Sequence, residues 1–116
     1  MNELNLSIFN YQELLERFMD EKGIVDDVIK VFEKKIDSQF KIIEENIKIL
    51  DFEKIKFEAH NIKGGALNLS ANLLAKETKK LEDTCKNHKN EKLTDIFENL
   101  KKEFENLKVE LRKNGL

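Results

Sequence analysis

His60 lies in a local pattern that suits phosphoryl chemistry. The stretch FEAHNIKGGALNLS places Lys63 three residues after this histidine and Gly64 four residues after it. In a helix, residues three and four apart lie one turn away on the same face. A neutral imidazole is a good nucleophile toward phosphorus, and a lysine ammonium can hold phosphoryl oxygens by charge-assisted contacts. The spacing therefore suits a histidine on a helix surface that accepts a phosphoryl group when another protein supplies the groups that activate the phosphorus.

Two adjacent glycines, Gly64 and Gly65, follow this histidine within a helix-period apolar run. Each glycine costs a helix about 1 kcal/mol relative to alanine, so the pair needs a reason. Gly64 leaves the backbone beside His60 bare, which would let another protein approach the imidazole. Gly65 turns toward a flank where helices pack, and close helix–helix approach there is a rival explanation for the pair.

The apolar periodicity of this segment predicts that His60 faces solvent. Its apolar row consists of Phe52, Ile55, Ala59, Ile62 and Ala66. At about 100° per residue, that row centres roughly 130° away from His60. Lys56, Phe57 and Leu67 share the histidine's face one or two turns away. Because Phe57 and Leu67 are apolar and expected to be exposed, we interpret them, with Lys56, as a docking patch for a partner.

The hydrophobic periods predict five helices that position this face. We expect helices over residues 11–19, 25–50, 52–69, 74–85 and 93–111. Asn10, followed by Glu13, and Asp51 are predicted N-caps of the first and third helices. Ser70 or Asn68 is expected to cap the fourth helix, and the polar stretch 86–92 is expected to form the last turn.

The composition favours an all-α protein. The 116 residues include no proline and only four glycines, and 38% are charged while 40% are hydrophobic. Such a composition is typical of long amphipathic helices joined by short turns. We therefore predict a single domain over residues 1–116. It should be an antiparallel up-and-down four-helix bundle with a short extra N-terminal helix closing one end.

Several classes of function are disfavoured. The net charge of −2 comes from 21 basic and 23 acidic residues that are interspersed, so we expect neither nucleic-acid binding nor membrane binding. No apolar run is long enough to span a bilayer, and residues 1–12 show no secretory signal. The single cysteine, Cys85, cannot form an internal disulfide. We expect a cytoplasmic protein.

Cys85 and His88 are three residues apart, which raises the question of a metal site. Two ligands without a second pair do not make a zinc site. His88 lies in a polar turn, whereas Cys85 belongs to the predicted core row of its helix. The periodicity also supplies no inward Glu and His pairs on facing helices, as a di-iron bundle would require. We predict no metal site and no bound cofactor.

The stretch AHNIKGGALNLSANLLAKETKKLE, residues 59–82, resembles the signature of histidine-containing phosphotransfer (HPt) domains. That signature has Ala-His, then Leu-Lys-Gly, a Leu-Gly pair, and a Leu-Glu in the next helix. The matching residues here are Ala59, His60, Ile62 in place of Leu, Lys63, Gly64, Leu69, Leu81 and Glu82. One departure is clear, since Ser70 stands where the family has glycine. We expect this serine to be tolerated at a turn.

The resemblance implies that His60 is a phosphoacceptor, with Lys63 stabilising the phosphoryl group and Gly64 giving the partner access. His60 would exchange phosphoryl groups with the aspartate of response-regulator receiver domains. The receiver would bring the Mg²⁺, and a sensor or hybrid histidine kinase would be a further partner. No Gly-rich nucleotide-binding box is present in the chain, so we expect a phosphocarrier and not an enzyme.

A second class of function fits the same helices. The chain would then be an adaptor, a degenerate HPt-like bundle that docks signalling proteins without carrying phosphate. The two hypotheses differ in whether a phosphorylated receiver domain labels the chain on His60.

Overall fold

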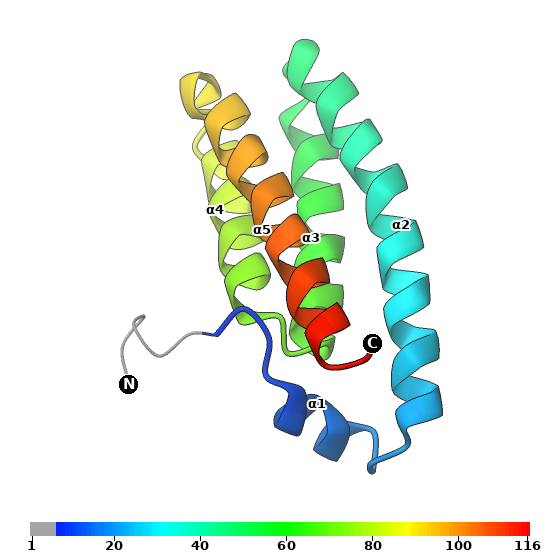
Figure 1. The fold of residues 1–116 in the computed structure, drawn as a ribbon. Coiled ribbons are helices and arrows are strands. Elements are labelled where there is room, and N and C mark those ends of the chain that lie inside the picture. Colours follow the sequence, from blue (N-terminus) through cyan, green and yellow to red (C-terminus); the bar gives the residue numbers. More distant parts are fainter. Residues whose placement is uncertain (1–6) are drawn as a thin grey trace.

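The computed structural model describes residues 7–116, and every regular element in that part of the chain is helical (Figure 1). The elements are α1 (Tyr11–Arg17), α2 (Lys22–Lys48), α3 (Phe52–Asn68), α4 (Asn72–Lys86), a short 3₁₀ helix η2 (Asn90–Lys92) and α5 (Leu93–Lys113). Residues 1–6 belong to the predicted domain and to the stretch in which we predicted no secretory signal, and they lie outside the described residues.

The four long helices form the body of the molecule, and α1 lies across one end of it (Figure 1). Helix α3 packs against α2 on one side and most extensively against α4 on the other, and α4 packs in turn against α5. The all-α prediction is confirmed. Because the connections between α2, α3 and α4 are only a few residues long, consecutive helices run in opposite directions.

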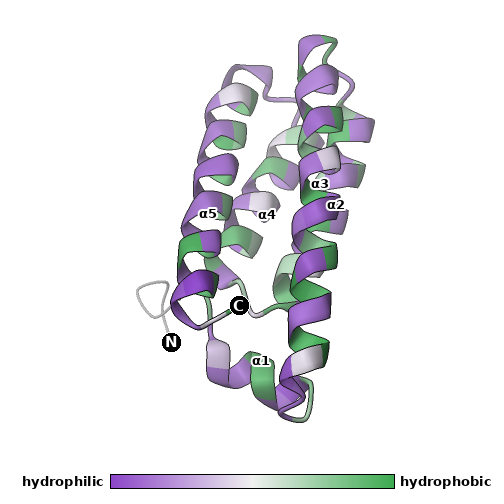
Figure 2. Ribbon diagram, turned by 45° about the vertical axis from the view of Figure 1, so that its right-hand side comes forward, coloured by the Kyte–Doolittle hydropathy of each residue, from purple (hydrophilic) through white to green (hydrophobic). Residues whose placement is uncertain are grey.

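The bundle encloses one hydrophobic core, to which each long helix contributes its apolar face (Figure 2). Burying apolar side chains on one stripe of each helix is the main favourable term in such a fold. The largest fully buried side chains are Leu14, Ile29, Ile36, Ile43, Ile55, Ile62, Leu69, Leu74, Leu81, Leu93, Leu100 and Leu107. Between α2 and α5, the ring of Phe40 lies edge-on to those of Phe97 and Phe104, with ring centroids 5.7 Å apart in each pair.

Two of the predicted helix starts are confirmed. The side chain of Asn10 accepts a hydrogen bond from the Glu13 backbone N–H at 3.0 Å, and that of Asp51 accepts one from Lys54 at 3.1 Å. Helix α1 is shorter than predicted and ends at Arg17. The chain turns sharply just beyond it, because Met19 and Asp20 have φ angles of +54° and +61°.

The prediction that Ser70 or Asn68 caps the fourth helix is wrong. Ala71 is the N-cap of α4, and no side chain caps it. Ser70 instead ends α3 with a φ of +57°, the left-handed conformation that glycine adopts without strain. This geometry explains why a glycine suits the position in the HPt signature. The strain of roughly 1–2 kcal/mol for a non-glycine residue is offset by a 2.6 Å hydrogen bond that the buried Ser70 hydroxyl donates to Glu13.

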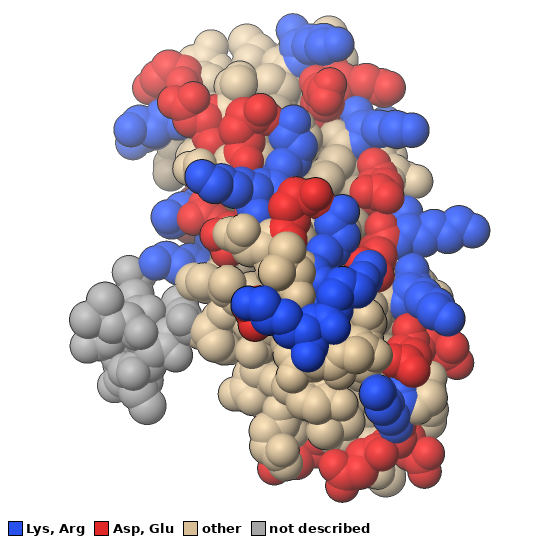
Figure 3. Space-filling view, viewed as in Figure 1, with Lys and Arg blue, Asp and Glu red and all other residues tan. Residues whose placement is uncertain are grey.

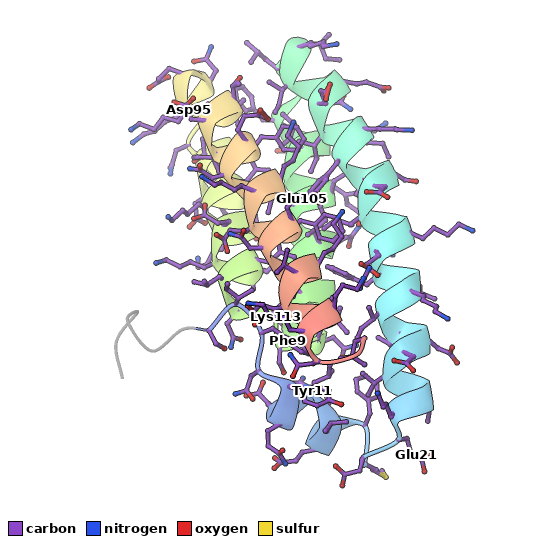
Figure 4. All side chains as sticks on the ribbon, in the orientation of Figure 1. Phe9, Tyr11, Glu21, Asp95, Glu105 and Lys113 are labelled. Carbon is purple, nitrogen blue, oxygen red and sulfur yellow. The ribbon has the colours of Figure 1, made fainter. Side chains whose placement is uncertain are left out.

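The Ser70 turn also anchors α1 to the bundle. Its carbonyl accepts a hydrogen bond from the Asn10 N–H at 3.1 Å, and Glu13 forms a 3.1 Å ion pair with Arg17. Phe9 and Tyr11 lie at the same end of the bundle as Lys113 (Figure 4). The short helix therefore closes the end of the bundle at which α3 turns into α4.

The adjacent glycines of α3 have different surroundings. A Cβ atom at Gly65 would lie 2.9 Å from two ring carbons of Phe32 on α2, whereas a Cβ at Gly64 would meet nothing within 4 Å. Close approach of α2 therefore accounts for Gly65. It does not account for Gly64, which lies on the same face as His60.

We expect Gly65→Ala to be less stable than Gly64→Ala by about 1–3 kcal/mol, because only the first methyl group overpacks against Phe32. Both variants gain the same helix propensity, so their difference isolates the packing effect. Urea denaturation of both proteins measures it. Equal free energies of unfolding would show that Phe32 moves aside without cost and that Gly65 is not required for helix packing.

Candidate functional site

The imidazole of His60 projects from the middle of α3 into solvent. Its side chain is 66% exposed, while Ala59 and Ile62 on the opposite face of the helix are buried. The helical period of 3.6 residues produces this arrangement, as the sequence predicted. The ring is therefore accessible to another protein without any rearrangement of the bundle.

A carboxylate on α4, that of Glu82, connects His60 and Lys63. Glu82 Oε2 lies 3.0 Å from His60 Nδ1, and Oε1 accepts a hydrogen bond from Lys63 Nζ at 2.8 Å. The Glu82 side chain is only 16% exposed, since it sits between α3 and α4. Each oxygen of the carboxylate thus has its own partner on the neighbouring helix.

The surroundings of Glu82 keep it ionised. Burial alone would raise its pKa, but hydrogen bonds from Lys63 and His60, together with their positive charges, outweigh that effect. They hold the pKa below its ordinary value of 4.5. Near neutral pH the Glu82 side chain is therefore an acceptor only.

The contact between Glu82 and His60 determines which ring nitrogen of His60 carries the proton and which has an available lone pair. Because the Glu82 carboxylate can only accept, Nδ1 of the imidazole carries the proton and donates it. In the neutral ring the lone pair then resides on Nε2. The site accordingly offers one nucleophilic atom, Nε2, on a ring whose orientation is fixed from the other side.

Two surface hollows flank the group formed by His60, Glu82 and Lys63. One, of about 360 Å³, is lined by Glu53, Lys56, Phe57, His60 and Glu82. The other, of about 390 Å³, is lined by Lys63, Leu67, Asn72, Ala75, Lys76 and Lys79. Phe57 and Leu67 are both exposed, as predicted. The histidine thus stands between two recesses that each expose an apolar side chain.

Residues 27–110, well over half of the chain, match the family model described as "Hpt domain". The chain belongs to the Hpt domain family. It is therefore a phosphotransfer domain of two-component signalling. The fold agrees with that of the crystal structure of histidine-containing phosphotransfer protein B (HptB) from Pseudomonas aeruginosa PAO1. The TM-score is 0.84 at 18% sequence identity, over 92% of this chain and 93% of that chain. A search of curated proteins found no match.

The structure of this Hpt domain brings the predicted site residues together on one face. It differs from the prediction in the surroundings of Lys63, and it adds Glu82 to the site. Lys63 is not an open surface lysine, since its side chain is only 24% exposed and is held by Glu82. Glu82 itself was not among the predicted site residues. The signal for it was present in the Leu81–Glu82 pair that matches the family signature.

The remaining candidates do not join this site. Cys85 is buried, and burial raises the pKa of its thiol to about 11. The ring of His88 stacks on that of Phe52 with centroids 4.6 Å apart. Over residues 7–116, no three or more His, Cys, Asp or Glu side chains are grouped to hold a metal ion. Within the same residues no helix combines the length and apolar character needed to cross a membrane.

We expect Glu82→Gln to lower the free energy of unfolding by about 1–2 kcal/mol at pH 7, because two charge-assisted hydrogen bonds lose their ionised acceptor. The folded-state pKa of Glu82 is lowered. Its contribution is therefore present above its unfolded pKa and disappears as the pH falls through the lowered folded value. Urea denaturation at pH 7 and at about pH 3 measures the difference in free energy of unfolding between Glu82→Gln and the unsubstituted protein.

Glu105→Gln provides the control for this experiment. Glu105 also pairs with a lysine, Lys108, but its side chain is 64% exposed, so its removal should change stability little at either pH. A destabilisation by Glu82→Gln that is the same at both pH values would mean that the shape of Glu82, and not its charge, supports the fold.

Proposed function

We propose that this Hpt domain accepts a phosphoryl group on Nε2 of His60 from the aspartyl phosphate of a response-regulator receiver domain and can return it. The observation that supports this proposal most directly is the exposed imidazole whose Nδ1 is held by an ionised carboxylate. In the forward step the P–O bond to the receiver's aspartate breaks, a P–N bond to Nε2 forms, and the aspartate leaves as a carboxylate.

Glu82 acts in this proposal as a positioning residue. Attack by Nε2 leaves positive charge on the imidazole ring, and the carboxylate 3.0 Å from Nδ1 stabilises that charge. The same contact prevents the ring from rotating away from the incoming phosphorus, so the reacting atom is oriented in advance. Because Glu82 approaches Nδ1, Nε2 remains open to the partner.

Lys63 acts on the phosphoryl group. Its ammonium is one helical turn from His60 and has three N–H donors, of which the hydrogen bond to Glu82 uses one. Lys63 can therefore bind a phosphoryl oxygen while it remains attached to Glu82. Its partial burial restricts its side chain, which lowers the entropic cost of that contact.

The convex site suits a carrier that relies on its partner for catalysis. His60 stands on an exposed helix surface and lines an open hollow of the described residues. In this proposal the receiver domain supplies the Mg²⁺ and the groups that activate its own aspartyl phosphate. A sensor or hybrid histidine kinase is the proposed source of phosphoryl groups at the start of the relay.

We expect a receiver domain carrying ³²P on its aspartate to label this protein in the presence of Mg²⁺. The label should be acid-labile and alkali-stable, as phosphoramidates are. His60→Gln should abolish it, whereas His88→Gln should retain it, since His88 lies in the turn beyond α4. Labelling that survives in His60→Gln, or no label from any receiver domain of the source organism, would contradict the proposal and favour the adaptor.

Access to His60 is tested at Gly64. We expect Gly64→Gln to slow phosphotransfer by at least tenfold, because the new side chain would occupy the space beside the imidazole that the partner's loop needs. Gly23→Gln is the matched control, because Gly23 also lies in a helix and a Cβ atom there would meet nothing within 4 Å. Single-turnover transfer rates and thermal melts of both variants measure the effect. Equal rates in the two variants would show that Gly64 is not needed for access.

A further inference from the structure

The hollow next to Lys63 differs in charge from the other recesses of the surface. Three lysines line it, Lys63, Lys76 and Lys79, and no acidic residue of the described chain does. Four other hollows are each lined by two carboxylates together with basic residues. The surface seen in Figure 3 likewise intersperses the two signs of charge. A recess lined by charges of one sign is therefore an exception among these five hollows of the described residues.

Apolar side chains also line the same hollow. They are Leu67 of α3, which is half exposed, and Ala75 of α4, which is buried. With a volume of about 390 Å³, the hollow can take one or two side chains from a partner. An apolar centre with a charged rim is the usual anatomy of a protein–protein interface.

The ion pairs of Lys63 and Lys79 leave positive charge available at the hollow. Lys79 pairs with Asp83 at 3.3 Å, but both side chains are about half exposed or more, and such pairs contribute little. Lys63 retains donors beyond its bond to Glu82. A carboxylate on a partner can therefore form charge-assisted contacts here without breaking a buried ion pair.

We propose that this hollow selects among receiver domains by binding an apolar side chain flanked by carboxylates on the receiver surface. The inference rests on the proposed function, since the hollow shares Lys63 with the phosphoryl site and is thus continuous with it. The occupant follows from complementarity, because carboxylates on the partner match Lys63 and Lys79, and an apolar side chain matches Leu67. A nucleic acid would need a basic surface extending beyond this recess, and the net charge of −2 opposes that.

The test measures docking separately from phosphotransfer. All variants are made in a His60→Gln background, and their affinity for each purified receiver domain of the source organism is measured by fluorescence anisotropy. Lys79→Gln and Leu67→Ala probe the hollow. Lys80→Gln is the control for charge, because Lys80 is the next residue of α4, has one ion pair with Glu77, and does not line the hollow. Val109→Ala is the control for apolar exposure, at 55% against 50% for Leu67.

For receivers with acidic residues beside an apolar one on their docking face, we expect Lys79→Gln to weaken binding about threefold at low salt. This effect should shrink as salt is added. Leu67→Ala should weaken binding about tenfold, and the two controls should change it less than twofold. Receivers without such acidic residues should bind more weakly and should not respond to Lys79→Gln.

Three results would overturn the inference. They are equal effects of Lys79→Gln and Lys80→Gln, equal effects of Leu67→Ala and Val109→Ala, and no binding by any receiver domain. Failure of the proposed function is distinguishable, because it would appear as selective docking in this assay without labelling of His60 by a phosphorylated receiver.

Discussion

Glu82 on α4 holds two groups of α3 with a single carboxylate, His60 through Oε2 and Lys63 through Oε1. Both contacts are about 3 Å long, so they exist only if α3 and α4 keep a fixed separation and register. The buried residues between the two helices maintain that separation, among them Ala59 and Ile62 on α3 and Leu81 on α4. The orientation of the His60 imidazole is thus a consequence of how the core packs.

Helix α3 meets different requirements on different faces. Its buried row packs into the core, Gly65 admits the ring of Phe32 from α2, and His60 and Gly64 lie on the solvent-facing side. Two neighbouring glycines would destabilise an isolated helix. Here one of them permits close packing, whereas the other leaves open the space beside the histidine. Packing against α2 and α4 compensates for the weak intrinsic propensity of the segment.

The sequence was sufficient for features that depend on one helix at a time. A period of 3.6 residues determines which side chains share a face, so the exposure of His60, Phe57 and Leu67 followed from spacing alone. The contact between Glu82 and Lys63 depends on the register between two helices, which the period within either helix does not determine. The left-handed conformation of Ser70 was also missed. Serine is a preferred N-cap residue, so the sequence favoured a cap, whereas the φ angle of Ser70 is set by the turn between α3 and α4.

That turn links the N-terminal helix to the site. His60 precedes Ser70 by ten residues and Glu82 follows it by twelve, so a tight reversal at Ser70 brings the two side chains to the same level of the bundle. The hydrogen bond from Ser70 to the Glu13 carboxylate, at 2.6 Å, belongs to a class worth about 1.5–3 kcal/mol. This is enough to offset the strain of roughly 1–2 kcal/mol in a left-handed serine. A glycine would adopt this left-handed turn without strain, whereas here contacts from α1 stabilise the turn at Ser70. Helix α1 thereby supports the register between α3 and α4 on which the His60–Glu82 contact depends.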